Sequence, residues 1–167
     1  MCGITGYNLT SQLPDENHGF SLALEESCRL ISHRGPDNTD FFKNDNLSLG
    51  LGHTRLSIID ISSSANQPMF SECKNFILIF NGEIYNFNEL KNELDFNPKK
   101  KYPTNWETNS DTEVLLKYYI RCFSENIKTS NFLNKLNGIF SLAIFNKITN
   151  ELIIARDSHG VKPLYIS

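Results

Sequence analysis

The stretch Asn75-Phe-Ile-Leu-Ile-Phe-Asn-Gly82 is an apolar run without the polar alternation of a strand that has one face in water. A second run of this kind covers residues 139–145. Continuous apolar runs of this length are typical of strands whose two faces are both covered. The two runs therefore predict strands that lie inside a layered domain.

The segments around these runs supply further strands and helices. Residues 20–31 carry Leu22, Ala23, Glu26 and Leu30 at a spacing suited to a helix that packs on a core. β-like runs cover residues 3–9, 49–61 and 151–156, helical patterns cover residues 88–94, 110–123 and 132–136, the last of which stops at Gly138, and residues 97–108 form a polar, breaker-rich loop. Together these predicted elements indicate an α/β domain with at least two sheet layers between helices and no internal linker.

The helix over residues 110–123 has a clear start signal. Ser110-Asp-Thr-Glu113 fits a capping box, in which the serine accepts a hydrogen bond from the backbone and Glu113 reaches back to the first N–H groups. The sequence therefore predicts that this helix begins at Ser110.

Composition narrows the class of protein. A chain of 167 residues suffices for one domain, which buries roughly 70% of its unfolded surface. The formal net charge of −3 gives no basic footprint for nucleic acid, and no segment approaches the roughly 20 apolar residues of a membrane span. We expect a cytoplasmic protein whose partners are small molecules or proteins.

The four cysteines are scattered and predict neither a disulfide framework nor a zinc site. Cys28 and Cys122 lie in apolar helical patterns and are expected to be buried thiols, whereas Cys73 is expected in a loop. Cys2 is different because it follows Met1 directly. If the initiator methionine is trimmed, one residue presents both a thiol and a free amine, whose reference pKa of about 7.7–8.0 suits it to accept the thiol proton.

Alone, each of these signals has a plain alternative. A cysteine at position 2 can be an accident of sequence, and Asn81-Gly82 is the strongest short signal for a hairpin turn. Seven motifs in order outweigh both alternatives: Met-Cys-Gly-Ile at 1–4, His-Arg-Gly-Pro-Asp at 33–37, Gly-His-Thr-Arg-Leu-Ser-Ile-Ile-Asp at 52–60, Gln-Pro-Met at 67–69, Asn-Gly-Glu-Ile-Tyr-Asn at 81–86, Ser-Asp-Thr-Glu at 110–113, and Ala-Arg-Asp at 155–157 with Gly-x-Lys-Pro-Leu-Tyr at 160–165.

With these motifs, nearly the whole chain resembles the class II glutamine amidotransferases, whose glutaminase domains are N-terminal-nucleophile hydrolases. The versions at 55–60 and 81–86 are similar to the asparagine synthetase branch. The resemblance implies a four-layer αββα sandwich of two mostly antiparallel sheets between helices. It also implies hydrolysis of L-glutamine to glutamate and ammonia through a Cys2 thioester.

The resemblance assigns roles to particular residues. Cys2 is the catalytic nucleophile, and the Asn81 side-chain amide with the Gly82 backbone N–H forms the oxyanion hole. Arg55 holds the substrate α-carboxylate as a bidentate pair, and Asp111, assisted by Glu83, faces the α-ammonium. The backbone of Leu56, Ser57, Ile58 and Ile59 lines the glutamine pocket.

Some of these residues also fit purely structural roles. Arg55 could be a surface arginine on an edge strand, although its neighbours are apolar, and Asp111 could serve the helix dipole alone. His33 is not assigned as a base, because the terminal amine suffices and its motif is expected to shape the pocket wall. His53 is expected to be a packed strand histidine. No cluster has metal-ligand spacing, so neither a metal nor another cofactor is expected in this domain.

The chain departs from the asparagine synthetase pattern in length. That family joins the glutaminase domain to a larger synthetase domain, which uses ATP and Mg, and the Ser-Gly-Gly-x-Asp-Ser loop of that domain does not occur here. Residues 2–167 are expected to form the glutaminase domain with an incomplete C-terminal edge, which gives its ammonia to a missing or separate synthetase. The alternatives are a different acceptor, such as a sugar, or a catalytically idle glutamine-binding module.

Overall fold

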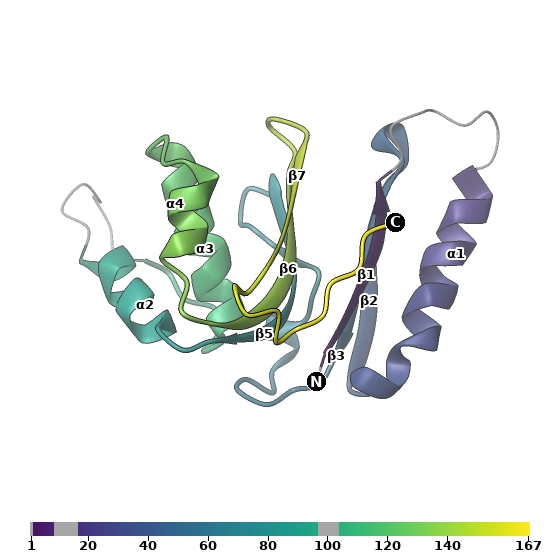
Figure 1. Cartoon of the computed structure of the whole chain (residues 1–167), viewed down its shortest axis with the longest axis horizontal. Helices are drawn as coiled ribbons and strands as arrows, with labels where there is room; N and C mark the ends of the chain where they lie inside the picture. The colour runs from purple at the N-terminus through teal and green to yellow at the C-terminus, as the bar shows by residue number, and fades with distance from the viewer. Residues whose placement is uncertain (1, 9–16, 97–103) are drawn as a thin grey trace.

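The computed structural model describes residues 2–8, 17–96 and 104–167, and the chain forms four layers (Figure 1). One helix covers the first sheet, the second sheet packs on the other face of the first, and three helices cover the second sheet. The first sheet has the order β1 (Gly3–Asn8), β3 (Leu49–Arg55) and β2 (Asn38–Asn44); the second has the order β4 (Met69–Phe70), β5 (Phe76–Ile84), β6 (Gly138–Asn146) and β7 (Glu151–Arg156). All of these strand pairs are antiparallel, so the predicted αββα sandwich is confirmed.

The two apolar runs form the centre of the second sheet. β5 and β6 pair over nine residues, from Phe76 opposite Asn146 to Ile84 opposite Gly138. Side chains alternate between the two faces of β5: Phe80 and its even-numbered neighbours pack against the helices, whereas Ile77 and Ile79 pack against the first sheet. Both faces are therefore buried, as the uninterrupted apolar pattern predicts.

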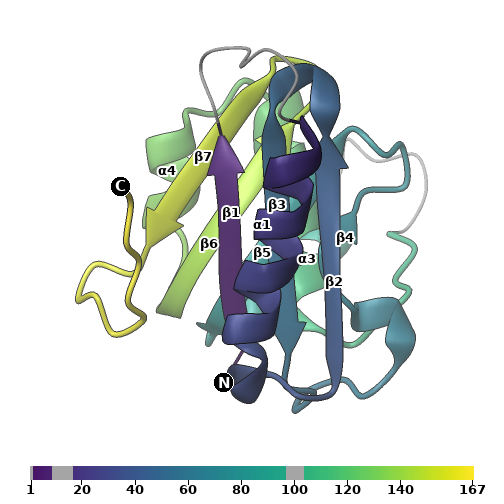
Figure 2. The same cartoon turned by 90° about the vertical axis from the view of Figure 1, so that its right-hand side faces the viewer.

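On the opposite side of the molecule, α1 (Asn17–Leu30) covers the first sheet (Figure 2). The expected apolar stripe was wrong, because Leu22 and Leu30 are 66% and 62% exposed, and Leu24 and Cys28 are buried instead. Ala23 and Glu26 are exposed as well. Close packing on β3 depends on Gly52, where an added Cβ would lie 2.4 Å from the Cys28 sulfur.

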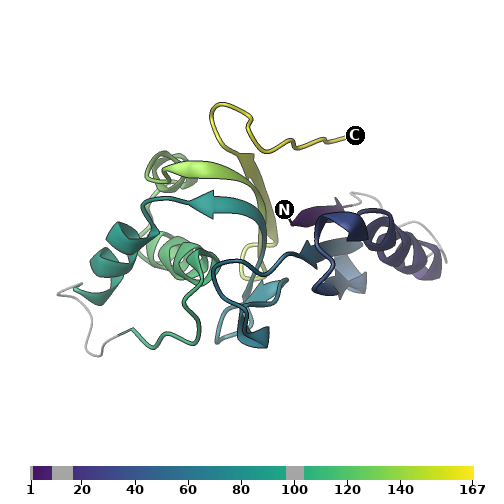
Figure 3. The ribbon, with the colours of Figure 1, turned by 90° about the horizontal axis from the view of Figure 1, so that it is seen from below.

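Three helices cover the second sheet: α2 (Phe87–Asp95), α3 (Asp111–Ser124) and α4 (Thr129–Asn134) (Figure 3). Only half of the predicted capping box forms at α3. The Ser110 hydroxyl accepts a hydrogen bond from the Thr112 N–H at 3.0 Å, but the Glu113 carboxylate accepts hydrogen bonds from the backbone of Glu107 and Thr108. The Ser110 N–H donates to the Thr108 hydroxyl instead.

One strand boundary differs from expectation, and one alternative interpretation is wrong. The β-like run at 49–61 is a strand only as far as Arg55, and the chain then turns into a loop that includes a short 3₁₀ helix at Ser63–Ala65. Asn81-Gly82 lies inside β5 rather than in a hairpin turn. Of the predicted loop at 97–108, residues 97–103 lie outside the described part of the chain, and residues 104–108 are in neither helix nor strand.

Within the described ranges, no helix has the length and apolar character needed to span a membrane.

Candidate active site

A cavity of about 280 Å³ opens where the ends of β1, β3 and β5 meet the start of α3. It brings together residues that are far apart in the sequence. Of the predicted site residues, the cavity is lined by Cys2, Arg55, Leu56, Ile58, Ile59, Asn81, Gly82, Glu83 and Asp111. Ser57 does not line it, and its N–H donates to the Asp37 carboxylate at 2.7 Å.

Cys2 is held by contacts with Leu56 and Arg34. Its sulfur accepts a hydrogen bond from the Leu56 N–H at 3.4 Å, and its thiol lies 3.7 Å from the Leu56 carbonyl oxygen. The Arg34 guanidinium donates from Nε to the Cys2 carbonyl at 3.1 Å. The expectation that the His-Arg-Gly-Pro-Asp motif shapes the pocket wall is wrong, because none of residues 33–37 lines the cavity, and His33 is exposed. The motif instead supports the nucleophile through Arg34.

The backbone of β5 presents the Gly82 N–H to the cavity. In a strand, alternate residues direct their N–H groups to the same edge. Along this edge, the Phe80 N–H donates to the Gln67 side chain at 2.6 Å and the Ile84 N–H donates to Asp111 at 3.0 Å. Gly82 lies between them, and its N–H has no hydrogen-bond partner among the described residues.

Gly82 cannot be replaced without moving a strand. An added Cβ would lie 2.1 Å from the carbonyl oxygen of Ile139 on β6. The glycine is therefore needed for the close approach of the two strands, which brings the free N–H to its place.

Asn81 faces the first sheet, on the same side of β5 as Ile77 and Ile79. Its side chain is buried and lines the cavity together with Cys2. Among the residues that the structure describes, its amide has no hydrogen-bond partner. A side-chain amide and a backbone N–H, both unpaired and adjacent, are the donor set that a developing oxyanion requires.

Arg55 is 6% exposed and ends the central strand of the first sheet, so the alternative of a surface arginine on an edge strand is wrong. Its Nη1 donates to the Ser62 carbonyl at 2.7 Å and to the Asn66 side chain at 2.6 Å, and its Nη2 donates to the Asp60 carbonyl. These contacts use three of the five N–H donors of a guanidinium. Contacts within the described chain thus leave Nε–H and one Nη2 hydrogen for a ligand.

Asp111 is buried at the first residue of α3. Burial raises the pKa of this carboxyl to about 6, although hydrogen bonds from the backbone of Ile84 and Thr112 lower it. The nearby charge of Glu83 raises it further. Asp111 is thus a poorly hydrated carboxylate near neutral pH, which favours a cationic partner in the cavity.

Sequence reasoning assigned no role to several residues that line the cavity, among them Gln67, Thr112 and Lys162. All three lie in quoted motifs, but only the fold brings them together at the cavity. The turn that carries Lys162 is built around Asp157, whose carboxylate accepts N–H groups from Phe140, His159, Val161 and Lys162. Burial opposes the ionisation of Asp157, but these four bonds outweigh it and lower its pKa to about 2.

His53 is fully buried, and its Nε2 lies 3.1 Å from the Phe80 carbonyl oxygen. Because a carbonyl can only accept, Nε2 carries the proton, and Nδ1 is left without a partner among the described residues. Burial lowers the pKa of His53 to about 4. The prediction of a packed strand histidine is confirmed.

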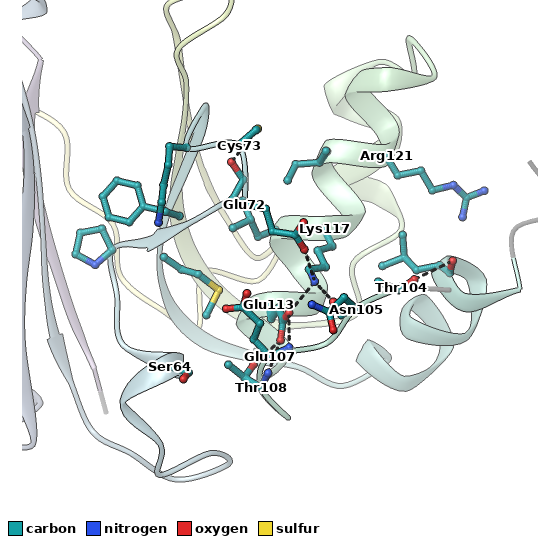
Figure 4. Close-up of a pocket in the computed structure, with 18 of the residues that line it drawn as sticks. Ser64, Glu72, Cys73, Thr104, Asn105, Glu107, Thr108, Glu113, Lys117 and Arg121 are labelled. Carbon is teal, nitrogen blue, oxygen red and sulfur yellow. Dashed lines mark hydrogen bonds and ion pairs between the residues drawn. The ribbon is translucent and has the colours of Figure 1, made fainter. Parts of the chain in front are cut away.

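A larger hollow, of about 1000 Å³, lies elsewhere, between α3 and the segments at 68–74 and 104–108 (Figure 4). Lys117 points into it and pairs with Glu113 at 2.8 Å and Glu72 at 3.6 Å. The exposed Cys73 also borders it, whereas Cys28 and Cys122 are buried, as expected. None of the predicted substrate-binding residues lines this hollow, so the smaller cavity is the candidate active site.

Comparisons with known proteins agree on one family. Residues 1–167 match the sequence profile of the family described as "Glutamine amidotransferase domain". Asparagine synthetase [glutamine-hydrolyzing] 1 of Bacillus subtilis (strain 168) is 40% identical over 165 residues, which are 99% of this chain and 24% of that protein. Asparagine synthetase B [glutamine-hydrolyzing] of Escherichia coli (strain K12) is 38% identical over 86% of this chain and 23% of that protein.

A solved structure shows the same fold. It is the glutamine phosphoribosylpyrophosphate amidotransferase from B. subtilis in complex with ADP and GMP, which is 27% identical, with a TM-score of 0.53. The match covers 70% of this chain and 24% of that one. This chain therefore spans about a quarter of the length of these relatives.

Proposed function

Because this chain belongs to the glutamine amidotransferase domain family, we propose that it hydrolyses L-glutamine to L-glutamate and ammonia through a thioester on Cys2. The observation that carries the proposal is the pair of unpaired donors, the Asn81 amide and the Gly82 N–H, in one cavity with the Cys2 thiol. Residues 2–167 are the proposed glutaminase unit.

The reaction begins with removal of Met1, which frees the amine of Cys2. This amine takes the thiol proton, and the thiolate attacks the δ-carbonyl carbon of glutamine. The carbonyl oxygen becomes an oxyanion and accepts hydrogen bonds from Asn81 and Gly82. The protonated amine then gives its proton to the departing nitrogen, ammonia leaves, and water hydrolyses the thioester to release glutamate.

Opposite charges in the cavity select the substrate. The two remaining donors of Arg55 offer a fork to the α-carboxylate, and the buried carboxylate of Asp111 accepts the α-ammonium, with Glu83 beside it. Leu56, Ile58 and Ile59 line the same cavity and form part of its wall. Both ends of an amino acid are thereby held, which positions the δ-amide for attack.

The ammonia is proposed to serve an ATP-dependent asparagine synthetase, as a further part of the same polypeptide or as a separate partner. The asparagine synthetases to which this chain is similar, and the small share of their length that it spans, support this assignment. ATP and Mg belong to that synthetase part, and the hydrolytic step uses the Cys2 thiol and amine, the Asn81 side chain, the Gly82 backbone N–H and water. The proposed location is the cytoplasm, where a thiol nucleophile stays reduced.

The test combines an intact mass with ammonia release. Protein whose mass shows loss of Met1 is expected to release ammonia from glutamine, and Cys2→Ala is expected to abolish the release. Cys73→Ala is the matched control, because this exposed thiol lies outside the cavity. Equal turnover with and without Met1 would exclude the terminal amine as the base, and no turnover in processed protein would favour an idle glutamine-binding module.

A further inference from the structure

Gln67 is a buried amide between the second sheet and α3, with 5% of its surface exposed. Its Oε1 accepts the Phe80 N–H at 2.6 Å, and its Nε2 donates to the Thr112 hydroxyl at 3.4 Å. The first bond fixes the orientation of the amide, because a backbone N–H can only meet the oxygen. Nε2 must then face Thr112 as a donor.

The Thr112 hydroxyl continues the chain of contacts. Since its oxygen accepts from Gln67, its own hydrogen is left for another acceptor, and the hydroxyl lowers the pKa of the Asp111 carboxyl on the preceding residue. Asp111 in turn accepts the Ile84 N–H through Oδ2 at 3.0 Å. The relay runs from Phe80 through Gln67, Thr112 and Asp111 to Ile84, so it begins and ends on β5.

The position of this relay is informative. Its two anchors, Phe80 and Ile84, flank Gly82 on the same edge of β5. One buried set of hydrogen bonds therefore borders the proposed oxyanion donor and holds the proposed acceptor of the α-ammonium. Buried polar networks with satisfied members hold their groups in one arrangement.

We propose that Gln67 is a positioning residue for glutamine binding, which acts through the Thr112 hydroxyl to orient the Asp111 carboxylate toward the substrate α-ammonium. The inference rests on the proposed function. Gln67 keeps the Thr112 oxygen occupied as an acceptor, so the hydroxyl hydrogen is directed to Asp111. Without this amide the hydroxyl is free to rotate away, and the carboxylate loses an interaction that sets its direction.

The test is a double-mutant cycle on binding. In the Cys2→Ala background with Met1 removed, calorimetry measures the Kd of L-glutamine for four further proteins: Gln67→Met, Thr112→Val, the double variant and Thr112→Ser. A relay predicts that either single variant weakens binding about tenfold and that the double variant is no weaker than Thr112→Val alone. Thr112→Ser keeps the hydroxyl and is expected to recover most of the affinity that Thr112→Val loses.

A second ligand separates positioning from general damage. 4-Carbamoylbutanoate is glutamine without the α-amino group, so its Kd is expected to change less than twofold in a folded Gln67→Met protein. Multiplicative losses in the cycle, to about a hundredfold, or unchanged glutamine affinity in Gln67→Met would overturn the relay. If the Cys2→Ala parent itself does not bind glutamine, the proposed function fails instead. Thermal unfolding of each variant shows whether it is folded. If Gln67→Met does not fold, Gln67→Glu replaces it, because a glutamate carboxylate keeps the bond from the Phe80 N–H but cannot donate to Thr112.

Discussion

At Asp111, folding and substrate binding make opposite demands. The carboxyl is buried, and its pKa of about 6 lies above the ordinary value of 3.8, so ionisation near neutral pH costs stability in the empty protein. A bound ammonium offsets that cost because it replaces the lost hydration. A group with only a structural role at the start of a helix would have no need of this burial.

Asp111→Asn is therefore expected to stabilise the empty protein while it weakens glutamine binding. Because the native pKa lies above the ordinary one, the wild type loses stability as the pH rises from about 4 to about 6, and the variant does not. The advantage of the variant is expected to reach about 1–3 kcal/mol above pH 6 and to vanish near pH 4. Urea unfolding at several pH values measures it, and a pH-independent difference would contradict the assignment of the shift to Asp111.

Arg55 combines two tasks, since it holds the loop at 60–66 and offers its remaining donors to the cavity. A lysine has one ammonium and cannot perform both tasks. Arg55→Lys is expected to raise the glutamine KM about tenfold or more and to lower kcat much less, as measured by ammonia release. Arg29→Lys, on the exposed face of α1, is the control and should leave both constants unchanged. An unchanged KM in Arg55→Lys would remove Arg55 from the carboxylate role.

At the scale of elements, local sequence patterns predicted those strands and helices that depend mainly on neighbouring residues. The buried strands β5 and β6 followed from their apolar runs, and β7 matched its predicted bounds of 151–156. The buried stripe of α1 was not found, because Leu22 and Leu24 are equally apolar and only the position of the sheet selects between them. The role of Glu113 was wrong for a related reason: the loop at 107–108, which folds against it, is not visible in a helix pattern.

The same distinction applies to the residues of the candidate site. Cys2, Asn81 and Asp111 were named because seven motifs in order carry a family resemblance, which assigns each of these residues its role. No local signal could show that the Gln67 side chain would meet Phe80 and Thr112, since these contacts depend on the packing of α3 against β5. Contacts that join elements remain hidden until the elements are placed.

The fit of α1 on β3 gives a prediction at this scale. At Gly52 an added methyl group would lie 2.4 Å from the Cys28 sulfur and 2.9 Å from a methyl group of Thr5, so Gly52→Ala is expected to cost about 1–3 kcal/mol of stability. Cys28→Ala removes the nearer atom and should recover part of that loss in the double variant. Denaturant unfolding of the four proteins measures the coupling. Purely additive losses would show that the contact with Cys28 is not the cause.

His53 links the two sheets through its bond to Phe80, and its protonation must break the neutral, buried arrangement. Its pKa of about 4 lies below the ordinary 6.5, so the unfolded chain binds more protons between these values and stability falls as the pH drops from about 6.5 to about 4. This loss, roughly 3 kcal/mol if His53 acts alone, opposes the gain from Asp111 in the same range. His53→Gln is expected to abolish this loss of stability. The difference in unfolding free energy between Asp111→Asn and the double variant His53→Gln/Asp111→Asn isolates the contribution of His53. An identical pH slope in these two proteins would contradict the prediction.

At the scale of the whole molecule, the cavity is lined by residues of both sheets, so a bound substrate adds contacts between layers that also meet through an apolar core and the bond from His53 to Phe80. Arg55 belongs to the first sheet and Cys2 directly precedes its strand β1, whereas Asn81 and Gly82 belong to the second. A ligand that contacts both sheets binds the folded protein alone, because unfolding separates its contacts. Its affinity must then appear as stability of the entire fold.

L-Glutamine is therefore expected to stabilise the Cys2→Ala protein, which binds but cannot form the thioester. At a concentration of 100 times Kd the expected gain is about 2.7 kcal/mol, which corresponds to a rise in Tm of about 5–10 °C for a chain of this size. D-Glutamine is the matched control, because its α-ammonium and α-carboxylate cannot both reach Asp111 and Arg55 while the δ-amide lies at the donors of Asn81 and Gly82. Differential scanning calorimetry with each enantiomer makes the comparison. Equal shifts from both enantiomers, or none from L-glutamine, would contradict a site that clamps both ends of the amino acid across the two sheets.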